Sequence, residues 1–426
     1  MKSPLIALCG LFVLAACDQA PQNTTSDQNS DPASVGSQSL EARADKLAQE
    51  LLIADTHIDV PYRLHKLYED VTRPTVDGDF DVPRAFAGGL DVAFMSIYTP
   101  ADYEFEAPGK ATAHADQMID LVERIIATAP DQATIAHSTD EVMAARAAGR
   151  IALPLGMENG APIAGSLDLL DHFYKRGIRY ITLAHSRSNH IADSSYDEAR
   201  PHDGLTAFGT TLIHAMNRMG IMIDVSHISD QAFWDVMAES ATPVLATHSS
   251  ARHFTPGFER NMADDMIKAM AAKGGVIMIN FGSAFLTEAA NGYNKRRDTA
   301  YEAWLEETEQ EASAELETTF ETRYRAENPY PFATLSHVLD HIDHVVEIAG
   351  IDAVGIGSDY DGVGDSLPVG LKDVSAYPNL IKGLLQRGYD EAGIEKIMGG
   401  NLMRLWRAVE DHATKAQNDA TAPANE

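Results

Sequence analysis

The sequence predicts an α/β protein built as a (β/α)8 TIM barrel, with a helical insertion after the seventh strand. Short apolar runs alternate with segments of helical periodicity along most of the chain. Polar residues of metal-binding type follow most of these runs. Continuous apolar runs between helices are typical of parallel strands that are buried on both faces.

Eight apolar runs have the length of strands, at residues 51–54, 90–98, 151–156, 178–184, 220–225, 243–247, 274–281 and 353–358. Eight strand-and-helix units are what a closed barrel of this type requires. An open doubly wound sheet is the alternative architecture. It is less favoured, because no glycine-rich phosphate-binding fingerprint follows the first run.

The intervening segments space their apolar residues at three and four, as amphipathic helices do. They cover residues 111–127, 139–148, 205–219, 230–240, 263–273, 331–349, 375–386 and 390–398. Residues 294–328 break this rhythm, because they are very rich in glutamate. We interpret them first as a solvated helical excursion, and second as a cover over the barrel mouth.

The N-terminus is similar to a bacterial lipoprotein signal peptide. Met1-Lys2 gives a positive start, residues 5–16 are apolar but short for a membrane span, and small residues precede Cys17. The resemblance implies cleavage before a lipid-bearing Cys17 and a periplasm-facing lipoprotein of the cell envelope, in either the inner or the outer membrane. An ordinary secretory signal with an incidental Cys17 is the alternative.

Composition divides the remaining chain and excludes some functions. Residues 18–40 are polar and predict a flexible tether, 41–412 the barrel, and 413–426 a disordered tail. The net charge of -30 excludes nucleic acid as a partner. Cys9 and Cys17 both belong to the signal, so the mature domain has no thiol. No later run could span a membrane, so membrane contact would come only through the lipid.

Polar residues lie at the ends of six predicted strands, where the loops of such a barrel converge on one mouth. They are His57, Asp59, Glu158, His185, Asp224, His227, His248, Asp359 and Asp361. Any one of these histidines would more often be an ordinary core residue. Their joint placement at the same end of the barrel predicts a metal site.

The donor types favour zinc, because three of these histidines (His57, His227 and His248) and two of the carboxylates (Asp59 and Glu158) form a nitrogen and oxygen set without sulfur. Two metals held roughly 3.5–4 Å apart need a shared anionic ligand. Glu158 is the candidate bridge, because it lies between the first-strand pair and the later histidines. The fourth run, 178–184, contains no lysine that could be modified to serve instead.

Seven motifs together resemble the membrane dipeptidase family, also called renal dipeptidase. They lie at residues 55–59, 156–160, 183–186, 223–227, 247–250, 259–261 and 355–363. The resemblance spans about residues 48–410 and ends in the turn at 400–402. It implies a binuclear zinc peptidase with the ligands His57 and Asp59 on one ion, His227 and His248 on the other, and Glu158 bridging them.

The resemblance also implies three further roles and an activity. His185 and Arg260 match the residues that bind substrate, and Asp359 matches the catalytic acid/base, which also contacts substrate. The expected reaction is hydrolysis of L,L and L,D dipeptides by a hydroxide that bridges the metals. His185 would donate to the developing oxyanion, and Arg260 would bind the terminal carboxylate.

Several alternatives stay open at this point. Asp361 competes with Asp359 for the acid/base role, and Arg260 could form a structural ion pair with a neighbouring acid. Another binuclear amidohydrolase, such as an N-acyl amino acid deacylase or a lactonase, is the second function, and an inactive substrate-binding lipoprotein the third. A homodimer follows the family's pattern, without its disulfide. Loop histidines His190, His202 and His253 face the mouth or solvent, whereas His65, His172, His214, His337, His341 and His344 lie on helices away from the mouth.

Overall fold

The computed structural model describes residues 39–421. The predicted signal peptide with Cys17, and the tether up to residue 38, lie outside the described residues. The first helix, α1 (Leu40–Glu50), begins at Ser39, whose hydroxyl accepts a hydrogen bond from the backbone N–H of Ala42 at 3.2 Å. Within residues 39–421 no helix combines the length and the apolar character needed to cross a membrane.

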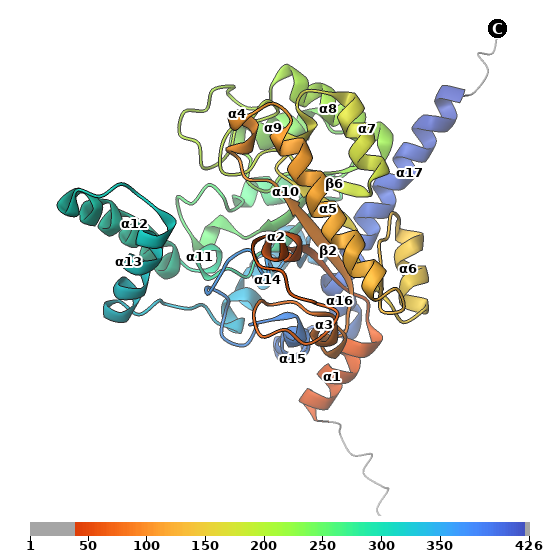
Figure 1. Cartoon of the computed structure of the whole chain (residues 1–426). Coiled ribbons are helices and arrows are strands. Elements are labelled where there is room, and N and C mark those ends of the chain that lie inside the picture. The colour runs from red at the N-terminus through yellow and green to blue at the C-terminus, as the bar shows by residue number, and fades with distance from the viewer. Residues whose placement is uncertain (1–38, 422–426) are drawn as a thin grey trace, which may run out of the picture. The chain divides into compact units, whose positions relative to one another are not determined.

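The curled parallel sheet has ten strands in residues 39–421, of which eight correspond to those of the predicted (β/α)8 barrel, and the fold class is confirmed (Figure 1). In sheet order these eight are β1 (Ile53–Ile58), β2 (Leu90–Tyr98), β5 (Leu155–Glu158), β6 (Ile178–Thr182), β7 (Met222–Asp224), β8 (Leu245–Ser249), β9 (Val276–Ile279) and β10 (Val354–Ile356). A parallel bridge between Ile58 and Tyr360 joins the two ends of this order. The carboxyl ends of the first and last strands therefore lie side by side.

The third predicted strand, 151–156, is divided into two. Ile151–Ala152 forms β4, which pairs with a short strand β3 (Ala133–Thr134), and β5 starts at Leu155. Pro154 separates the two pieces, because proline has no N–H to donate to a neighbouring strand. Its carbonyl still accepts from the Met95 N–H at 2.9 Å, so β5 stays in register with β2.

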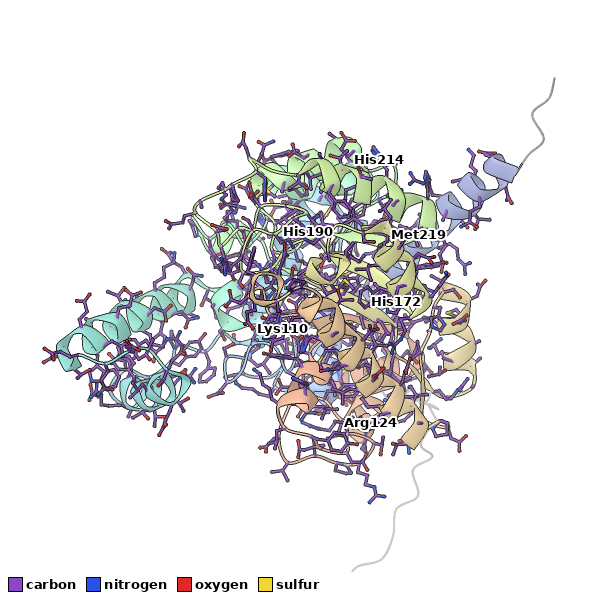
Figure 2. All side chains as sticks on the ribbon, turned by 45° about the horizontal axis from the view of Figure 1, so that its top comes forward. Lys110, Arg124, His172, His190, His214 and Met219 are labelled. Atoms are coloured by element: carbon purple, nitrogen blue, oxygen red, sulfur yellow. The ribbon has the colours of Figure 1, made fainter. Side chains whose placement is uncertain are left out.

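Helices cover the outside of the sheet. They are α2 (Val60–Lys66), α3 (Val82–Gly88), α4 (Tyr103–Glu106), α5 (Lys110–Thr128), α6 (Thr139–Ala147), α7 (Leu167–Lys175), α8 (Ala207–Met219), α9 (Asp230–Glu239), α10 (Asp264–Ala272), α11 (Ser283–Leu286), α14 (Leu335–Ala349), α15 (Tyr377–Gln386) and α16 (Glu391–Glu395). His172 on α7 and His214 on α8 lie on this outer layer (Figure 2), where they pair with Asp116 and Glu239.

The insertion after the seventh strand is confirmed as helical. It consists of α12 (Glu288–Thr308) and α13 (Ala314–Glu327), which lie together beside the barrel (Figure 1). Their contact is aromatic, with the ring of Phe320 5.3 Å from that of Tyr301 and 5.5 Å from that of Trp304. Apolar residues inside a glutamate-rich segment therefore hold the two helices to each other.

The chain ends in a π-helical turn, Lys396–Gly400, that continues into α17 (Asn401–Thr421). The side-chain amide of Asn401 donates to the carbonyls of Ile351 and Val354, both at 2.8 Å, and so fixes α17 to β10. Trp406 is fully buried against Phe94 beneath the strands. The helix runs to Thr421, whereas the sequence predicts a disordered tail from residue 413.

Candidate metal centre

The metal-binding residues predicted from the sequence lie together at the carboxyl ends of the strands. His57 belongs to β1, Asp59 follows it, Glu158 ends β5, and His248 belongs to β8. His227 follows β7 at a left-handed backbone position, with φ of 70°. All five side chains are buried. Residues from four separate strands therefore meet in one place.

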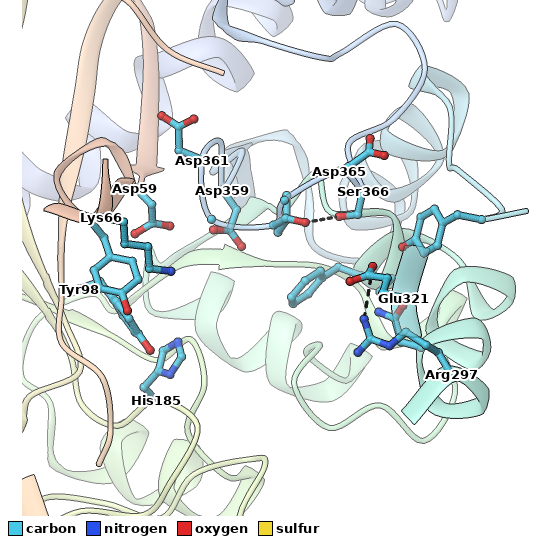
Figure 3. Close-up of a pocket in the computed structure, with 18 of the residues that line it drawn as sticks. Asp59, Lys66, Tyr98, His185, Arg297, Glu321, Asp359, Asp361, Asp365 and Ser366 are labelled. Carbon is cyan, nitrogen blue, oxygen red and sulfur yellow. Dashed lines mark hydrogen bonds and ion pairs between the residues drawn. The ribbon is translucent and has the colours of Figure 1, made fainter. Parts of the chain in front are cut away.

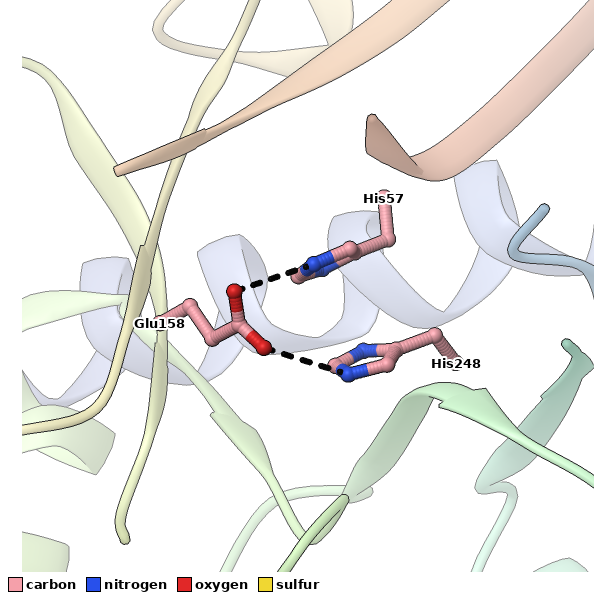
Figure 4. A group of neighbouring side chains, drawn as sticks. All are labelled: His57, Glu158 and His248. Carbon is pink, nitrogen blue, oxygen red and sulfur yellow. Dashed lines mark ion pairs between the residues drawn. The ribbon is translucent and has the colours of Figure 1, made fainter. Parts of the chain in front are cut away.

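Glu158 occupies the centre of this group, and its two oxygens face different histidines (Figure 4). Oε2 lies 3.3 Å from the Nε2 atom of His57. Oε1 lies 3.3 Å from Nε2 of His227 and 3.4 Å from Nε2 of His248. Both oxygens of this carboxylate therefore contact imidazoles of the donor cluster.

Three overlapping sets of donor atoms are close enough to bind a cation. They are His57, Glu158 and His248; Glu158, His185 and His227; and His57, Asp59 and Asp359. The Nε2 atoms of His227 and His248 are 2.8 Å apart. Because Glu158 and His57 each belong to two sets, the site is a shared cluster.

Several of these buried donor atoms have no hydrogen-bond partner in residues 39–421. They include Nε2 of His57 and Oδ1 of Asp59. Leaving such an atom buried and unsatisfied costs about 1–3 kcal/mol. A bound cation would provide the missing partner, and the nitrogen and carboxylate donors suit a borderline divalent ion. The residues present therefore fit the metal that the sequence predicts.

The electrostatics of His227 and His248 favour metal binding. Burial, with Arg260 nearby, holds the pKa of His227 well below its ordinary value, and burial with His57 nearby does the same for the pKa of His248. Both rings are then neutral and keep a lone pair for a metal. Burial alone would raise the pKa of Glu158, but the imidazoles of His57 and His185 hold it well below the usual range.

Further side chains fix the ligands in orientation. Nδ1 of His57 lies 2.9 Å from the hydroxyl of Tyr180, and Nδ1 of His248 lies 2.7 Å from the hydroxyl of Thr247. The Ser96 hydroxyl donates to Oε2 of Glu158 at 3.0 Å. Such contacts hold a ligand in the tautomer and position that a metal needs.

Asp359 and Asp361 have different surroundings, although both adopt left-handed backbone conformations. Asp359 accepts a hydrogen bond from the side-chain amide of Asn280 at 2.7 Å and belongs to the donor set with His57. Burial, followed by the nearby carboxylate of Asp59, raises the pKa of Asp359 to about 7. Burial also raises the pKa of Asp361 to about 7, but the carboxyl of Asp361 pairs with Nε of Arg63 at 3.1 Å. Only Asp359 therefore lies among the donor atoms.

Arg260 is buried, and within residues 39–421 its guanidinium makes no ion pair with a neighbouring acid. Its Nη1 donates to the Ser249 hydroxyl at 2.7 Å and its Nη2 donates to the His248 carbonyl at 2.8 Å. The acid beside it, Glu259, pairs with Arg200. Nε of Arg260 is buried without a partner, and the guanidinium lies over the ring of Phe285 at 5.2 Å. The alternative of a structural ion pair is thereby excluded.

His185 reaches the same centre from the loop after β6. Its Nε2 lies 3.3 Å from Oε1 of Glu158, and its ring lies 4.9 Å from that of Tyr98. The other loop histidines do not join it. His190 pairs with Glu104, and Nε2 of His202 is 2.9 Å from the Asn189 carbonyl.

A cavity of about 790 Å³ opens onto this centre (Figure 3). Its inner wall includes Asp59, Glu158, His185, His227 and Asp359. Its outer wall includes side chains of the insertion, namely Asn294, Arg297, Thr318, Glu321, Thr322 and Arg325. The first interpretation from the sequence, a solvated helical excursion, is therefore incomplete. The insertion also forms part of the cavity wall.

Three contributors were missed from the sequence. Asn280, directly after β9, holds Asp359, and Tyr180, inside β6, holds His57. Tyr98 at the end of β2 lines the cavity. Asn280 and Tyr98 each carry a signal that could have found them, since each is a polar residue at a strand end. Tyr180 carries none, because an aromatic residue inside an apolar run is typical of core.

The barrel and the buried donor cluster define a metal-dependent hydrolase with its active site at the carboxyl ends of the strands. The profile of the family described as Membrane dipeptidase (Peptidase family M19) matches residues 41–420. The chain belongs to this family and is a metal-dependent dipeptidase.

Known proteins support the assignment. Dipeptidase tcpJ of Claviceps purpurea is 33% identical over 370 residues, covering 84% of this chain and 77% of that protein. The probable dipeptidase PvdM of Pseudomonas aeruginosa has a TM-score of 0.77 at 26% identity, covering 88% of this chain and 99% of that one. A metallo peptidase called dipeptidase AC has a TM-score of 0.69 at 26% identity, covering 84% of this chain and 98% of its own.

Proposed function

We propose that the chain hydrolyses L,L and L,D dipeptides with two zinc ions, held by His57 and Asp59 on one side, His227 and His248 on the other, and Glu158 between them. The observation that carries this proposal is the division of the Glu158 oxygens between His57 and the other two histidines. When bound, two such ions lower the pKa of water toward neutrality and polarise a carbonyl oxygen. The protein's own side chains bind the substrate, donate to the developing oxyanion and transfer the proton.

Arg260 binds the terminal carboxylate of the dipeptide. Its Nη atoms are held by Ser249 and by the His248 carbonyl, while its Nε has no protein partner. A guanidinium fixed in this way can present its fork to a carboxylate. Preference for a free carboxylate close to the scissile bond explains why a short peptide would be chosen over a long chain.

His185 and Asp359 act on the reacting atoms. His185 lines the cavity 3.3 Å from Glu158, where it can donate to the oxygen that gains charge. The pKa of Asp359 is raised to about 7, chiefly by burial. A carboxyl group that titrates near neutrality can accept a proton from the attacking water and pass it to the leaving amine.

Export and anchoring complete the proposal. The leader through Cys17 supports a lipoprotein of the cell envelope, with residues 18–40 as a tether, so the catalytic barrel would face the periplasm. A homodimer formed without disulfides is part of the same proposal. Mass spectrometry of the membrane fraction tests the anchor, because a mature chain that starts at a diacylated Cys17 is expected. A chain that keeps residues 1–16, or that carries an unmodified Cys17, would contradict it.

The central experiment uses protein that starts after Cys17. Its metal content is measured, and hydrolysis is followed for L,L and L,D dipeptides beside tripeptides, N-acyl amino acids and lactones. About two zinc ions per chain are expected from the two-metal arrangement, with turnover of dipeptides only. Turnover of N-acyl amino acids or lactones in place of dipeptides would overturn the proposed substrate class.

A further inference from the structure

A second group of metal-binding side chains lies outside the barrel mouth. His253 on the 3-10 turn η2 (Arg252–Phe254), Asp264 at the start of α10, and His344 on α14 each offer one donor atom. The three atoms lie within 4.8 Å of one another. No other such group outside the active site occurs in the part of the chain that the structure describes. Two neighbouring elements, η2 and α10, and the distant helix α14 therefore bring their donors to one place.

The geometry leaves these donors open to a ligand. Nε2 of His344 lies 2.9 Å from Oδ1 of Asp264, and the rings of His253 and His344 stack at 4.3 Å between centroids. Within residues 39–421 neither ring nitrogen of His253 makes a hydrogen bond. His253 is exposed, and the other two side chains are half-buried. The stacked ring of His253 can therefore turn about its χ angles to bring a nitrogen toward the other two donors.

We propose that His253, Asp264 and His344 form a surface site for a divalent cation of the zinc, nickel or copper class. Two imidazole nitrogens and one carboxylate oxygen suit these ions, whereas magnesium and calcium prefer oxygen donors throughout. Water would complete the coordination. The site is separate from the active centre, because it shares no residue with it.

The position of the site indicates a structural role. η2 lies in the segment 251–262. This segment follows the strand that carries His248, and it contains Arg260. The backbone N–H of Ala251 already donates to Nδ1 of His341 on α14, at 3.1 Å. A cation held by His253, Asp264 and His344 would add to the contacts that this segment already makes with α14 and α10. It would thereby restrain the segment that positions Arg260.

Counting ions in matched variants tests the site. The protein is made without a histidine tag and dialysed to equilibrium in buffered free zinc. His253→Ala and His344→Ala each remove one donor. His214→Ala is the control, because His214 forms a similar surface pair with Glu239, at 2.8 Å, without a second imidazole. The wild type and His214→Ala should each hold one zinc ion more per chain than the other two variants.

The comparison does not depend on the active site, because every variant keeps those ligands. Equal zinc content in all four proteins would overturn the surface site while leaving the dipeptidase proposal intact. Thermal unfolding gives a second measurement. Added zinc should raise the Tm of the metal-loaded wild type and His214→Ala, but not that of His344→Ala, because an ion that binds only the folded state stabilises it. Added magnesium should have no such effect, and an equal magnesium shift would contradict the proposed donor chemistry.

Discussion

The hydroxyl of Tyr180 lies 2.9 Å from Nδ1 of His57, on the side of the ring opposite to Glu158. The contact fixes which nitrogen of His57 faces the donor cluster. Gly156 makes it possible, because a Cβ at that position would lie 1.9 Å from the Tyr180 ring. A glycine on β5 thus determines the position of a residue on β6, which in turn orients a residue on β1.

Tyr180→Phe should weaken metal binding without unfolding the barrel. It removes a hydrogen-bond partner of a metal ligand, a change that typically costs about 10–100-fold in metal affinity or activity. Competition with a chelator measures the affinity. Tyr360→Phe is the control, because the buried hydroxyl of Tyr360 has no hydrogen-bond partner among residues 39–421. Equal metal affinity in both variants would show that the Tyr180 contact is unimportant.

Glu158→Gln should lose metal and activity together. The amide removes the negative charge that both sets of donors share, and two cations close together need that charge. Metal analysis and dipeptide turnover are measured on the same sample. Ser96→Ala, which removes only the hydrogen bond to Oε2 of Glu158, should keep the metal and most of the activity. Full metal content in Glu158→Gln would rule out a bridging role.

Asp359→Asn should keep the metal and lose rate by about 10²–10⁴-fold, the usual contribution of general acid–base catalysis. Asp361→Asn is the matched change two residues away, and it should act on stability, because Asp361 pairs with Arg63. Measurements of kcat and of Tm separate the two effects. If Asp361→Asn alone lost rate, the roles would have to be exchanged.

The pH profile should show an acid limb that belongs to Asp359. Its pKa is raised to about 7 by burial. The carboxylate form accepts the proton, so kcat/KM should fall as the pH drops through this pKa. Bound cations favour the carboxylate and lower the pKa, so the limb is expected below pH ~7 in the metal-loaded enzyme. The limb should disappear from the residual activity of Asp359→Asn, and its persistence there would assign it to another group.

Arg260→Ala should reduce kcat/KM for dipeptides by about tenfold or more, because a hydrogen bond to a charged group contributes about 1.5–3 kcal/mol. Dipeptide amides, which lack the terminal carboxylate, should be poor substrates of the wild type and should lose little further in the variant. Arg176→Ala provides the comparison, since Arg176 pairs with Asp116 outside the cavity. An equal loss on dipeptides and their amides would exclude carboxylate binding by Arg260.

Much of the barrel could be predicted from the sequence, because parallel strands buried on both faces leave continuous apolar runs. β2 was predicted to its exact ends. The division of the third strand at Pro154 was not predicted, because proline also occurs in edge strands without dividing them. The residues predicted as metal ligands lie close together in the structure because they stand at or just after the carboxyl ends of the strands.

Other parts of the site could not be found in this way. The choice between Asp359 and Asp361 needs coordinates, because it depends on left-handed turns that point the two side chains to different neighbours. The contribution of α12 and α13 to the cavity likewise depends on how this polar insertion is positioned relative to the barrel mouth. The glutamate-rich composition of the insertion does not predict this position.

The bridge between Ile58 and Tyr360 has a consequence for when the enzyme can mature. His57 and Asp59 belong to the first strand, while Asp359 follows the last, so the donor set spans a junction between segments synthesised about 300 residues apart. A nascent chain cannot assemble this set until its final strand has emerged and docked. Completion of the active site would therefore be a late event that depends on closure of the barrel, and chains truncated before that strand would carry His57 and Asp59 without Asp359.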